Sequence, residues 1–507
     1  MLSDDRESRT SRTQNSQDFG QLEATSTNIS PQPPSITAGY IVPRQLTTDV
    51  LPNEVLLDIF ASYVESQEKR DAWHTLTRVC RRWRNIACGS PRRLNLRIFC
   101  SGRIPVKEKL DLWPPFPIVL TVGIYGEERV DDNILATLKH HERICGINIW
   151  GVSGSPWKQI LPLMQKPFPI LTDLGLSHDD DGDLLSVVVP ADLFLGGSAP
   201  RLRTLSLRGI PFPGLPKLLL STTHLTQLEL QKIPDSGYIA PEAMVACIST
   251  LTRLESLNLD LQSHEPRSEW GRRRTHSPTR ALLPSLTCFT FMGASEYLED
   301  IVDGIDTPLL DELSISFFHQ PTGIFHTPRL TQFISRLPEL KTCNEARMCL
   351  HSFSATVKIT VLKTTTNASF MLESYDGHPY FQLPPFVHLC TSSPLQVLVP
   401  TVERLTICGS YFKLPLDQDH ESTDPNLWRE LLQPFTAVKD LSLFPDVAPR
   451  IALVMQKLVR ESMTESLPAL QNILLKDLEP SGQVLKGIRQ FVAARQLAGH
   501  PTHFSLK

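Results

Sequence analysis

The sequence predicts an α/β protein in which a short N-terminal helical module precedes a long, irregular solenoid with a curved parallel sheet. Two short amphipathic stretches lie together near residues 50 to 87, and the pattern L-x-x-L-x-L then returns many times along the chain. With 507 residues, the chain also exceeds the length at which one compact hydrophobic core stops growing. Length and pattern together favour several domains or an extended repeat architecture.

The charge balance argues against two classes of partner. The 50 Lys and Arg residues stand against 54 Asp and Glu residues, which gives a formal net charge of −4. This balance provides no overall electrostatic drive toward nucleic acid or an acidic membrane. We therefore expect neither a nucleic-acid nor a membrane partner.

The cysteines and the first residues of the chain bear on its compartment. The ten cysteines are scattered, with Cys343 and Cys349 the closest pair, so neither the CxxC pairs of a zinc site nor a dense disulfide framework is present. The polar start MLSDDRESRTSRTQNSQ lacks the apolar core of a secretory signal, and no run approaches 18 apolar residues. We expect a soluble intracellular protein, in the cytoplasm, the nucleus or both, with no cofactor and no metal.

Residues 1–45 are expected to form a disordered leader, because they are rich in polar residues, contain the stretch SPQPPS and lack any apolar period. Apolar periodicity begins at Leu46, so we place a helical module at residues 46–98. Within LPNEVLLDIF, Pro52 suits a first helical turn, and four apolar residues recur along one face: Val55, Leu56, Ile59 and Phe60.

A second amphipathic helix is predicted over AWHTLTRVCRRWRNIA. Its apolar residues Leu76, Val79, Cys80 and Trp83 follow the i, i+3, i+4, i+7 spacing, with arginines largely on the other side. So small a module buries little surface, and each large apolar side chain left exposed costs about 1.5 to 3 kcal/mol. The module therefore needs a partner. Patterning alone allows two: a separate protein, or the following domain of the same chain, whose N-terminal end the helices would cap.

The residues of this module resemble the F-box consensus. The string Leu51-Pro52-x-Glu54-Val55-Leu56-x-x-Ile59-Phe60, followed by Leu76-x-x-Val79-Cys80-Arg81-x-Trp83, carries both its Leu-Pro-x-Glu opening and its Val-Cys-x-x-Trp close. The resemblance implies that the module binds a Skp-family adaptor, which joins such proteins to a cullin scaffold and a ring-finger subunit. It also implies an adaptor-binding set: Leu51, Pro52, Glu54, Val55, Leu56, Ile59, Phe60, Leu76, Val79, Cys80 and Trp83.

A repeat with a ragged period occupies the rest of the chain, which we divide into a solenoid at 99–495 and a tail at 496–507. Each copy of L-x-x-L-x-L places its last two apolar residues at the period-2 spacing of a short strand. The clearest copies are Leu202, Leu205, Leu207; Leu225, Leu228, Leu230; and Leu254, Leu257, Leu259. Weaker copies begin at Ile144, Leu171, Leu286, Leu310, Val402, Val438 and Leu470.

With its recurring L-x-x-L-x-L pattern, this solenoid resembles a leucine-rich repeat. We call the repeat degenerate because the positions where the family has Asn or Cys are occupied by Ile210, Ile233 and Gln262. Stretches such as PEAMVACIST and PRLTQFISRL have helical spacing and are expected to connect the strands. Between about 340 and 400 the pattern breaks, and we expect strands in SATVKITVLK and SPLQVLVP around a polar, aromatic insertion. The F-box and the ragged repeats together resemble the large F-box protein family of mushroom-forming fungi.

The strand register predicts which residues face a partner. In x-L-x-L-x the leucines point inward, and the residues between them point to the concave surface, where repeat proteins commonly bind. The face so predicted is polar and mixed in sign, which suits a protein surface or degron, although any solvated sheet face has the same composition. Its residues are Thr204, Ser206, Arg208, Gln227, Glu229, Gln231, Ser256, Asn258, Asp260, Glu312, Ser314 and Ser316.

A search for chemistry finds no catalytic residues. The acidic run at 178–183 fails the EF-hand pattern, and no nucleophile elbow, HExxH helix, P-loop or dinucleotide fingerprint occurs. We expect a non-enzymatic substrate-recognition subunit of a cullin-type ubiquitin ligase, which binds an adaptor through its F-box and an unknown protein through its repeats. The alternatives are an interaction scaffold that never engages a ligase and, last, an enzyme with an unrecognised site.

Overall fold

The computed structural model describes residues 50–67, 72–101, 110–111, 113–123, 132–151, 156–178, 193–261, 280–318, 327–351, 354–360, 368–375, 387–388, 390–391, 393–410, 425–461, 466–476 and 482–506. The chain divides into two units, residues 1–55 and 56–507. The expected leader at 1–45 and the acidic residues 179–183 lie outside the described residues.

Three helices open the described chain: α1 (Asn53–Gln67), α2 (Ala72–Val79) and α3 (Arg81–Gly89). The prediction of one continuous helix across residues 72–87 is wrong, because Cys80 adopts an extended backbone with φ −154° and ψ 172°. Its sulfur accepts a hydrogen bond from the Trp83 amide at 3.4 Å, so Cys80 ends one helix and caps the next. The ring of Trp83 in turn packs 4.7 Å from that of Phe60, which joins α3 to α1.

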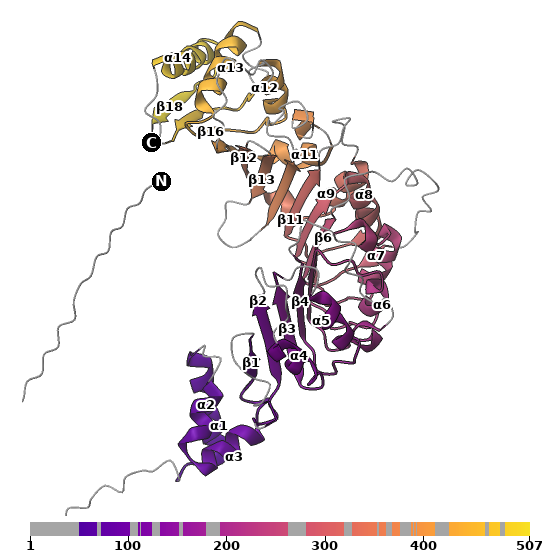
Figure 1. Ribbon diagram of the computed structural model, residues 1–507. Helices are drawn as coiled ribbons and strands as arrows, with labels where there is room; N and C mark the ends of the chain where they lie inside the picture. Colours follow the sequence, from indigo (N-terminus) through magenta and orange to yellow (C-terminus); the bar gives the residue numbers. More distant parts are fainter. Residues whose placement is uncertain are drawn as a thin grey trace, which may run out of the picture. The chain divides into compact units, whose positions relative to one another are not determined.

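A single 16-stranded sheet follows (Figure 1). Its order is β1-β2-β3-β4-β5-β6-β7-β9-β11-β14-β13-β12-β15-β16-β17-β18. The strands are β1 (Ile98–Cys100), β2 (Ile118–Gly123), β3 (Ile144–Trp150), β4 (Asp173–Ser177), β5 (Thr204–Arg208), β6 (Gln227–Ile233), β7 (Ser256–Leu261), β9 (Cys288–Gly293), β11 (Glu312–Phe318), β12 (Glu345–His351), β13 (Ser354–Thr360), β14 (Ser369–Tyr375), β15 (Arg404–Ser410), β16 (Asp440–Leu443), β17 (Asn472–Leu475) and β18 (His503–Leu506). A second sheet pairs β8 (Ala281–Leu282) with β10 (Ile305–Asp306).

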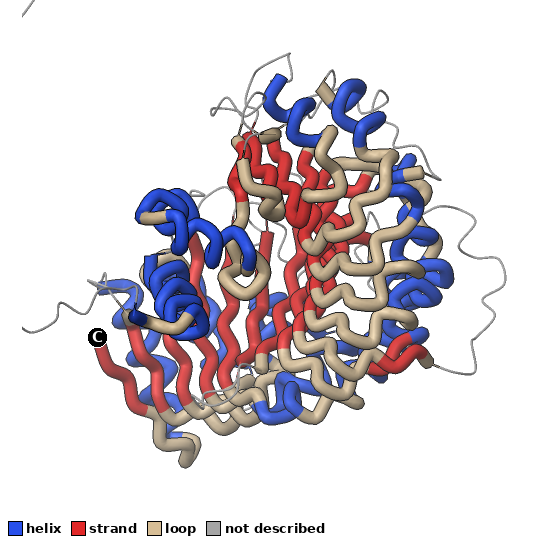
Figure 2. Tube along the Cα trace, turned by 90° about the horizontal axis from the view of Figure 1, so that it is seen from below, coloured by secondary structure: helices blue, strands red, loops and turns tan. Residues whose placement is uncertain are grey.

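The predicted fold class is confirmed: a helical module precedes a repeat solenoid with a curved parallel sheet. Figure 2 shows the strands as one continuous curved band. One strand departs from the parallel pattern, because β13 runs antiparallel to both β12 and β14. The reason is local, since only two residues separate β12 from β13 and so short a connection cannot cross back to a parallel strand.

Helices connect the strands of the solenoid, and Figure 1 shows α5 to α9 along its outer side. The helical spacing of PEAMVACIST and PRLTQFISRL is confirmed by α7 and α9. The helices are α4 (Asp132–Leu138), α5 (Trp157–Leu163), α6 (Leu215–Leu219), α7 (Pro241–Ile248), α8 (Ser295–Gly304), α9 (Pro328–Ser335), α11 (Ser393–Leu398), α12 (Pro425–Leu432), α13 (Ala448–Glu461) and α14 (Gly482–Leu497).

The leucines of the repeat form the core of the solenoid. Every copy of L-x-x-L-x-L named above supplies a strand, and its inward residues are buried. Neighbouring copies are in register, so Leu205, Leu228 and Leu257 are successive partners across β5, β6 and β7. The polar residues between them share the opposite side of the sheet, which we call the concave face.

Carbonyl groups at the strand entries tie successive repeats together. The carbonyl of Arg203 accepts the amides of Thr226 and Gln227, at 2.8 and 3.0 Å. The carbonyl of Thr226 likewise accepts the amides of the next repeat, at Glu255 and Ser256. In each of these two repeats one backbone carbonyl thus accepts hydrogen bonds from two amides of the next repeat, and these bonds depend on no particular side chain.

Two predictions near the C-terminal end are wrong. SPLQVLVP is not a strand but α11 followed by a short 3₁₀ turn at Val399–Thr401, because Leu395, Leu398 and Val399 are buried at helical spacing. Residues 496–507 are not a free tail, since β18 adds to β17 as the last strand of the sheet. The buried guanidinium of Arg495 fixes the residue before β18, because it donates hydrogen bonds to the Thr502 hydroxyl and to the carbonyls of Pro468 and Leu470.

Candidate functional site

The residues that resemble the F-box consensus separate into buried and exposed groups. Leu56, Phe60 and Leu76 are buried and hold the helices together. The exposed members are Pro52, Glu54, Val55, Ile59 and Val79, and those of intermediate exposure are Leu51, Cys80 and Trp83. The alternation follows helix geometry, because a helix that packs on one side must turn its other apolar residues outward.

Ile59 and Val79 are the exposed apolar side chains of the module beyond residue 55, with 46% and 54% of their surface accessible. They lie on α1 and α2, next in sequence to residues that are buried or part-buried. Covering such a side chain is favourable by about 1.5 to 3 kcal/mol relative to leaving it in water. These two positions are therefore suited to contact with another protein.

An aromatic cluster joins α2 to the segment before β2. The ring of Trp73 lies 5.6 Å from that of Phe116 and 5.9 Å from that of Trp113, both in edge-to-face geometry. Arg143 fixes this segment, since its guanidinium donates to the carbonyls of Leu110 and Pro114 at 3.1 and 3.0 Å. The partial burial of the Arg143 guanidinium disfavours its charged form and lowers its pKa.

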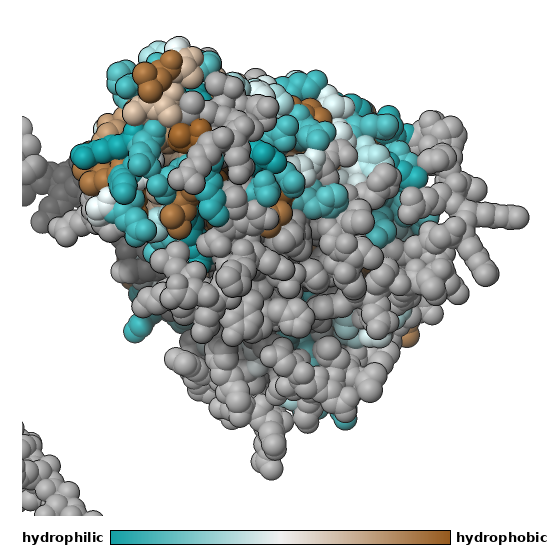
Figure 3. Space-filling view, turned by 90° about the horizontal axis from the view of Figure 1, so that it is seen from above, coloured by the Kyte–Doolittle hydropathy of each residue, from teal (hydrophilic) through white to brown (hydrophobic). Residues whose placement is uncertain are grey.

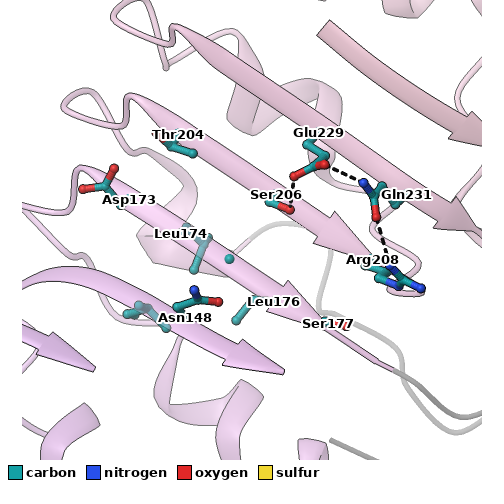
Figure 4. A pocket seen from close by; sticks show the side chains of 12 residues that line it. Asn148, Asp173, Leu174, Leu176, Ser177, Thr204, Ser206, Arg208, Glu229 and Gln231 are labelled. Carbon is teal, nitrogen blue, oxygen red and sulfur yellow. Dashed lines mark hydrogen bonds between the residues drawn. The ribbon is translucent and has the colours of Figure 1, made fainter. Parts of the chain in front are cut away.

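The concave face is hollowed across β3, β4, β5 and β6, with a volume of about 310 Å³ (Figure 4). Gly175 contributes to the hollow, because a Cβ atom there would lie 2.9 Å from the side-chain oxygen of Asn148. The polar residues that line it come from each strand in turn: Asn148, Asp173, Ser177, Thr204, Ser206, Arg208, Glu229 and Gln231.

A hydrogen-bond network fixes one wall of this hollow. The carboxylate of Glu229 accepts hydrogen bonds from the Ser206 hydroxyl at 2.8 Å and from the Gln231 amide (Figure 4). The side-chain amide of Asn258 also donates to this carboxylate, at 3.3 Å. The Gln231 oxygen accepts from Arg208 at 3.2 Å. The wall therefore presents oriented donors, acceptors and charges of both signs, which is the chemistry that recognises a folded surface or peptide.

The structure brings together part of the predicted concave set. Thr204, Ser206, Arg208, Glu229 and Gln231 line the hollow, whereas Gln227 is exposed beside it. Ser256, Asn258 and Asp260 continue the row on β7, and burial raises the pKa of the Asp260 carboxyl.

Ser314 and Ser316 lie at positions of the same face, where both side chains are buried. These short side chains stand between longer ones on the flanking strands, and the Ser316 hydroxyl donates to Glu373 of β14 at 2.9 Å. Glu312, two residues earlier on β11, is exposed.

Sequence reasoning did not name three of the polar lining residues: Asn148, Asp173 and Ser177. The sequence does carry a signal for them, because each lies between or beside the inward-pointing apolar residues of a weaker L-x-x-L-x-L copy. Extending the register of β5 to β4 and β3 places them in the same row.

Among the residues that the structure describes, no group of three His, Cys, Asp or Glu side chains is arranged to hold a metal ion. The same residues contain no helix long and apolar enough to cross a membrane. Figure 3 views the molecule from above Figure 1 and shows hydrophobic residues as separate brown spots among hydrophilic ones.

Comparison with known proteins supports the resemblance found in the N-terminal module. A family model described as F-box-like matches residues 48–97, so the chain carries an F-box-like domain there. No curated protein sequence matches the chain significantly.

Among solved structures, the chain is similar to the leucine-rich repeat-containing protein LegL7 from Legionella pneumophila, with 11% identity and a TM-score of 0.27. That match covers 78% of this chain and 97% of the other. At this level of similarity, the fold class rests on the chain's own strand order and burial pattern.

Proposed function

We propose that this chain is a non-enzymatic substrate-recognition subunit of a cullin-type ubiquitin ligase. Its F-box-like domain would bind a Skp-family adaptor, and its solenoid would bind a target protein on the concave face. Ubiquitin transfer would then be accelerated by proximity, because the complex holds the target near the conjugating enzyme. The match at residues 48–97 supports the adaptor half of this proposal.

The observation that carries the proposal is the exposure of Ile59 on α1 and Val79 on α2, in a module whose helices bury Leu56, Phe60 and Leu76. Both belong to the string that resembles the F-box consensus, and the resemblance assigns them to the adaptor surface. A surface of this kind gains free energy when a partner covers it.

The concave hollow supports the second half of the proposal. Protein interfaces combine close packing with directed hydrogen bonds and a polar rim, and the wall built around Glu229 offers such groups in a fixed arrangement. We further propose membership in the F-box family of mushroom-forming fungi and a location in the cytoplasm, the nucleus or both.

Co-purification with a Skp-family adaptor tests the proposal. The intact chain is expected to retain the adaptor, and the double variant Ile59→Asp, Val79→Asp is expected to lose it. Leu220→Asp is the matched control, since Leu220 is similarly exposed at 53% but follows α6 in the solenoid. The proposal fails if the folded, intact chain does not bind the adaptor, or if the control loses binding equally.

A second candidate function is an interaction scaffold in which the helices only cap the solenoid. The packing of Trp73 against Phe116, which is fully buried, favours this candidate, because a cap must cover the first apolar residues of a repeat array. Deletion of residues 49–98 separates the two. A cap is essential to the repeats and its loss unfolds them, whereas a separable adaptor module leaves their circular dichroism unchanged.

A further inference from the structure

Two cysteines lie side by side on the concave face. Cys349 on β12 and Cys408 on β15 are direct partners in the register of these neighbouring parallel strands. Their sulfur atoms are 2.8 Å apart, and neither cysteine takes part in a disulfide. Cys349 is partly exposed and Cys408 is buried, so the pair is reached from the side of Cys349.

The backbone places the pair in a geometry that a disulfide can adopt. Neighbouring strands lie about 4.7 to 4.9 Å apart, and disulfide-linked Cα atoms lie about 4.4 to 6.8 Å apart. Met348 and Ile407 point into the core, so the cysteine that follows each of them points to the concave face. Bond formation at about 2.05 Å requires the sulfurs to approach by only about 0.8 Å.

The same distance disfavours a metal bridge. With Zn–S bonds of about 2.3 Å, two thiolates of a tetrahedral site lie roughly 3.8 Å apart. The sulfurs of Cys349 and Cys408 are already closer than that. The described residues also offer no third ligand of a kind that would complete such a site.

A cation stands beside the pair. The Nε atom of Arg347 lies 3.4 Å from the Cys408 sulfur, and its guanidinium also lies 5.9 Å from the ring centre of Phe444. The hydrogen bond to Cys408 raises the pKa of Arg347, so the two groups interact electrostatically. The hydrogen bond with Cys408 and burial raise the pKa of the Cys349 thiol, and the guanidinium opposes that rise only in part. Because the guanidinium lies nearest to Cys408, it favours the thiolate of Cys408, which is the form of cysteine that reacts with oxidants.

We propose that Cys349 and Cys408 form a reversible disulfide within the folded chain when it meets hydrogen peroxide. One thiolate attacks a peroxide oxygen, the O–O bond breaks, and a sulfenic acid and hydroxide result. The second sulfur then attacks the sulfenic sulfur, forms the S–S bond and releases water. Overall, two thiols and one peroxide give one disulfide and two water molecules, and a small thiol reverses the step by exchange.

The modification would change the concave face locally. Neither sulfur of a disulfide can become a thiolate, so Arg347 no longer has an ionisable group beside it at Cys408. The guanidinium then presents its charge to the face on which the proposed target binds.

Mass spectrometry of the intact, folded chain tests the proposal. The reduced, folded protein is treated with hydrogen peroxide, it is then denatured while its remaining thiols are blocked with N-ethylmaleimide, and it is digested without reduction. A peptide pair linked through Cys349 and Cys408 is expected, with eight of the ten cysteines alkylated. Dithiothreitol is expected to restore both thiols.

Variants sharpen the result. Cys349→Ser and Cys408→Ser each abolish the link, whereas Cys288→Ser preserves it, since Cys288 is a half-exposed cysteine at a concave-face position on β9. Circular dichroism checks that each variant folds, and Cys349→Ala replaces the serine variant if it does not. The proposal is overturned if both thiols remain alkylated after oxidation, if the link forms only in urea, or if it joins two chains.

Discussion

Glu299 offers the sharpest test of how the repeats hold one another. This buried carboxylate belongs to α8, yet it accepts hydrogen bonds from the first amides of α9: Arg329 at 3.0 Å and Leu330 at 2.7 Å. Thr327, at the N-cap position of α9, makes no capping bond of its own. A side chain of one repeat therefore caps the helix of the next, where a carboxylate also complements the helix dipole.

The magnitude follows from these two bonds. A hydrogen bond to a charged group contributes about 1.5 to 3 kcal/mol, so Glu299→Ala is expected to cost about 3 kcal/mol even where water partly replaces the carboxylate. Glu299→Gln keeps one acceptor oxygen and loses the charge, and a cost near 1.5 kcal/mol is expected. A larger loss of stability for Glu299→Ala than for Glu299→Gln is as informative as the size of either loss.

Hydrogen exchange is the appropriate assay, because a long repeat array need not unfold in one step. A loss of about 3 kcal/mol corresponds to roughly 100-fold faster exchange at the Arg329 and Leu330 amides. Glu312→Gln, at an exposed position on β11, is the control and should leave these amides unchanged. If Glu299→Ala exchanges at the rate of the unaltered protein, the capping role is refuted.

Three further predictions concern the core and the two ends of the solenoid. Leu228→Ala should lower the free energy of unfolding by about 2 to 5 kcal/mol and Gln227→Ala by less than about 0.5; equal losses in denaturant titrations would contradict the assigned register. Arg495→Met should leave the hydrogen-bond acceptors around Thr502 without their donor and speed amide exchange in β18; unchanged exchange would show that Arg495 does not hold β18 in place. Trp73→Ala should lower Tm, since large aromatic truncations cost about 3 to 5 kcal/mol; an unaltered Tm would show that the aromatic cluster does not couple α2 to the repeats.

The solenoid could be predicted from sequence because its pattern is local. Each inward triplet, such as Leu202, Leu205 and Leu207, reports burial at period-2 spacing, and the structure buries all three. The helices α7 and α9 were equally visible in their apolar spacing. The ragged period did not obscure the fold, because the register of each strand depends on its own leucines and its neighbours.

The features that escaped prediction depend on contacts that spacing does not encode. The break at Cys80 leaves the i, i+3, i+4 pattern intact, so only backbone geometry reveals two helices. Likewise Leu56 and Ile59 lie within one turn of a helix, yet the packing of the module buries the first and exposes the second. The antiparallel β13 and the buried Ser316 also follow from tertiary neighbours.

The site was predictable in part for the same reason. The row of polar residues at Thr204, Ser206 and Arg208 follows from strand alternation, and the structure places all three around the hollow. That the hollow also reaches Asp173 and Asn148 depends on the missing side chain of Gly175, which opens space between two strands. The pairing of Cys349 with Cys408 across 59 residues of chain has no local signal at all.

The proposed function depends on binding of the F-box-like domain to a Skp-family adaptor. Its most direct test is isothermal titration of the purified, full-length chain with a purified adaptor of that family. We expect a one-to-one complex. Its affinity should fall at least about 100-fold, the loss of about 3 kcal/mol, in the Ile59→Asp, Val79→Asp variant and stay unchanged in Leu220→Asp. No detectable binding by the folded chain, or equal binding by all three proteins, would contradict it.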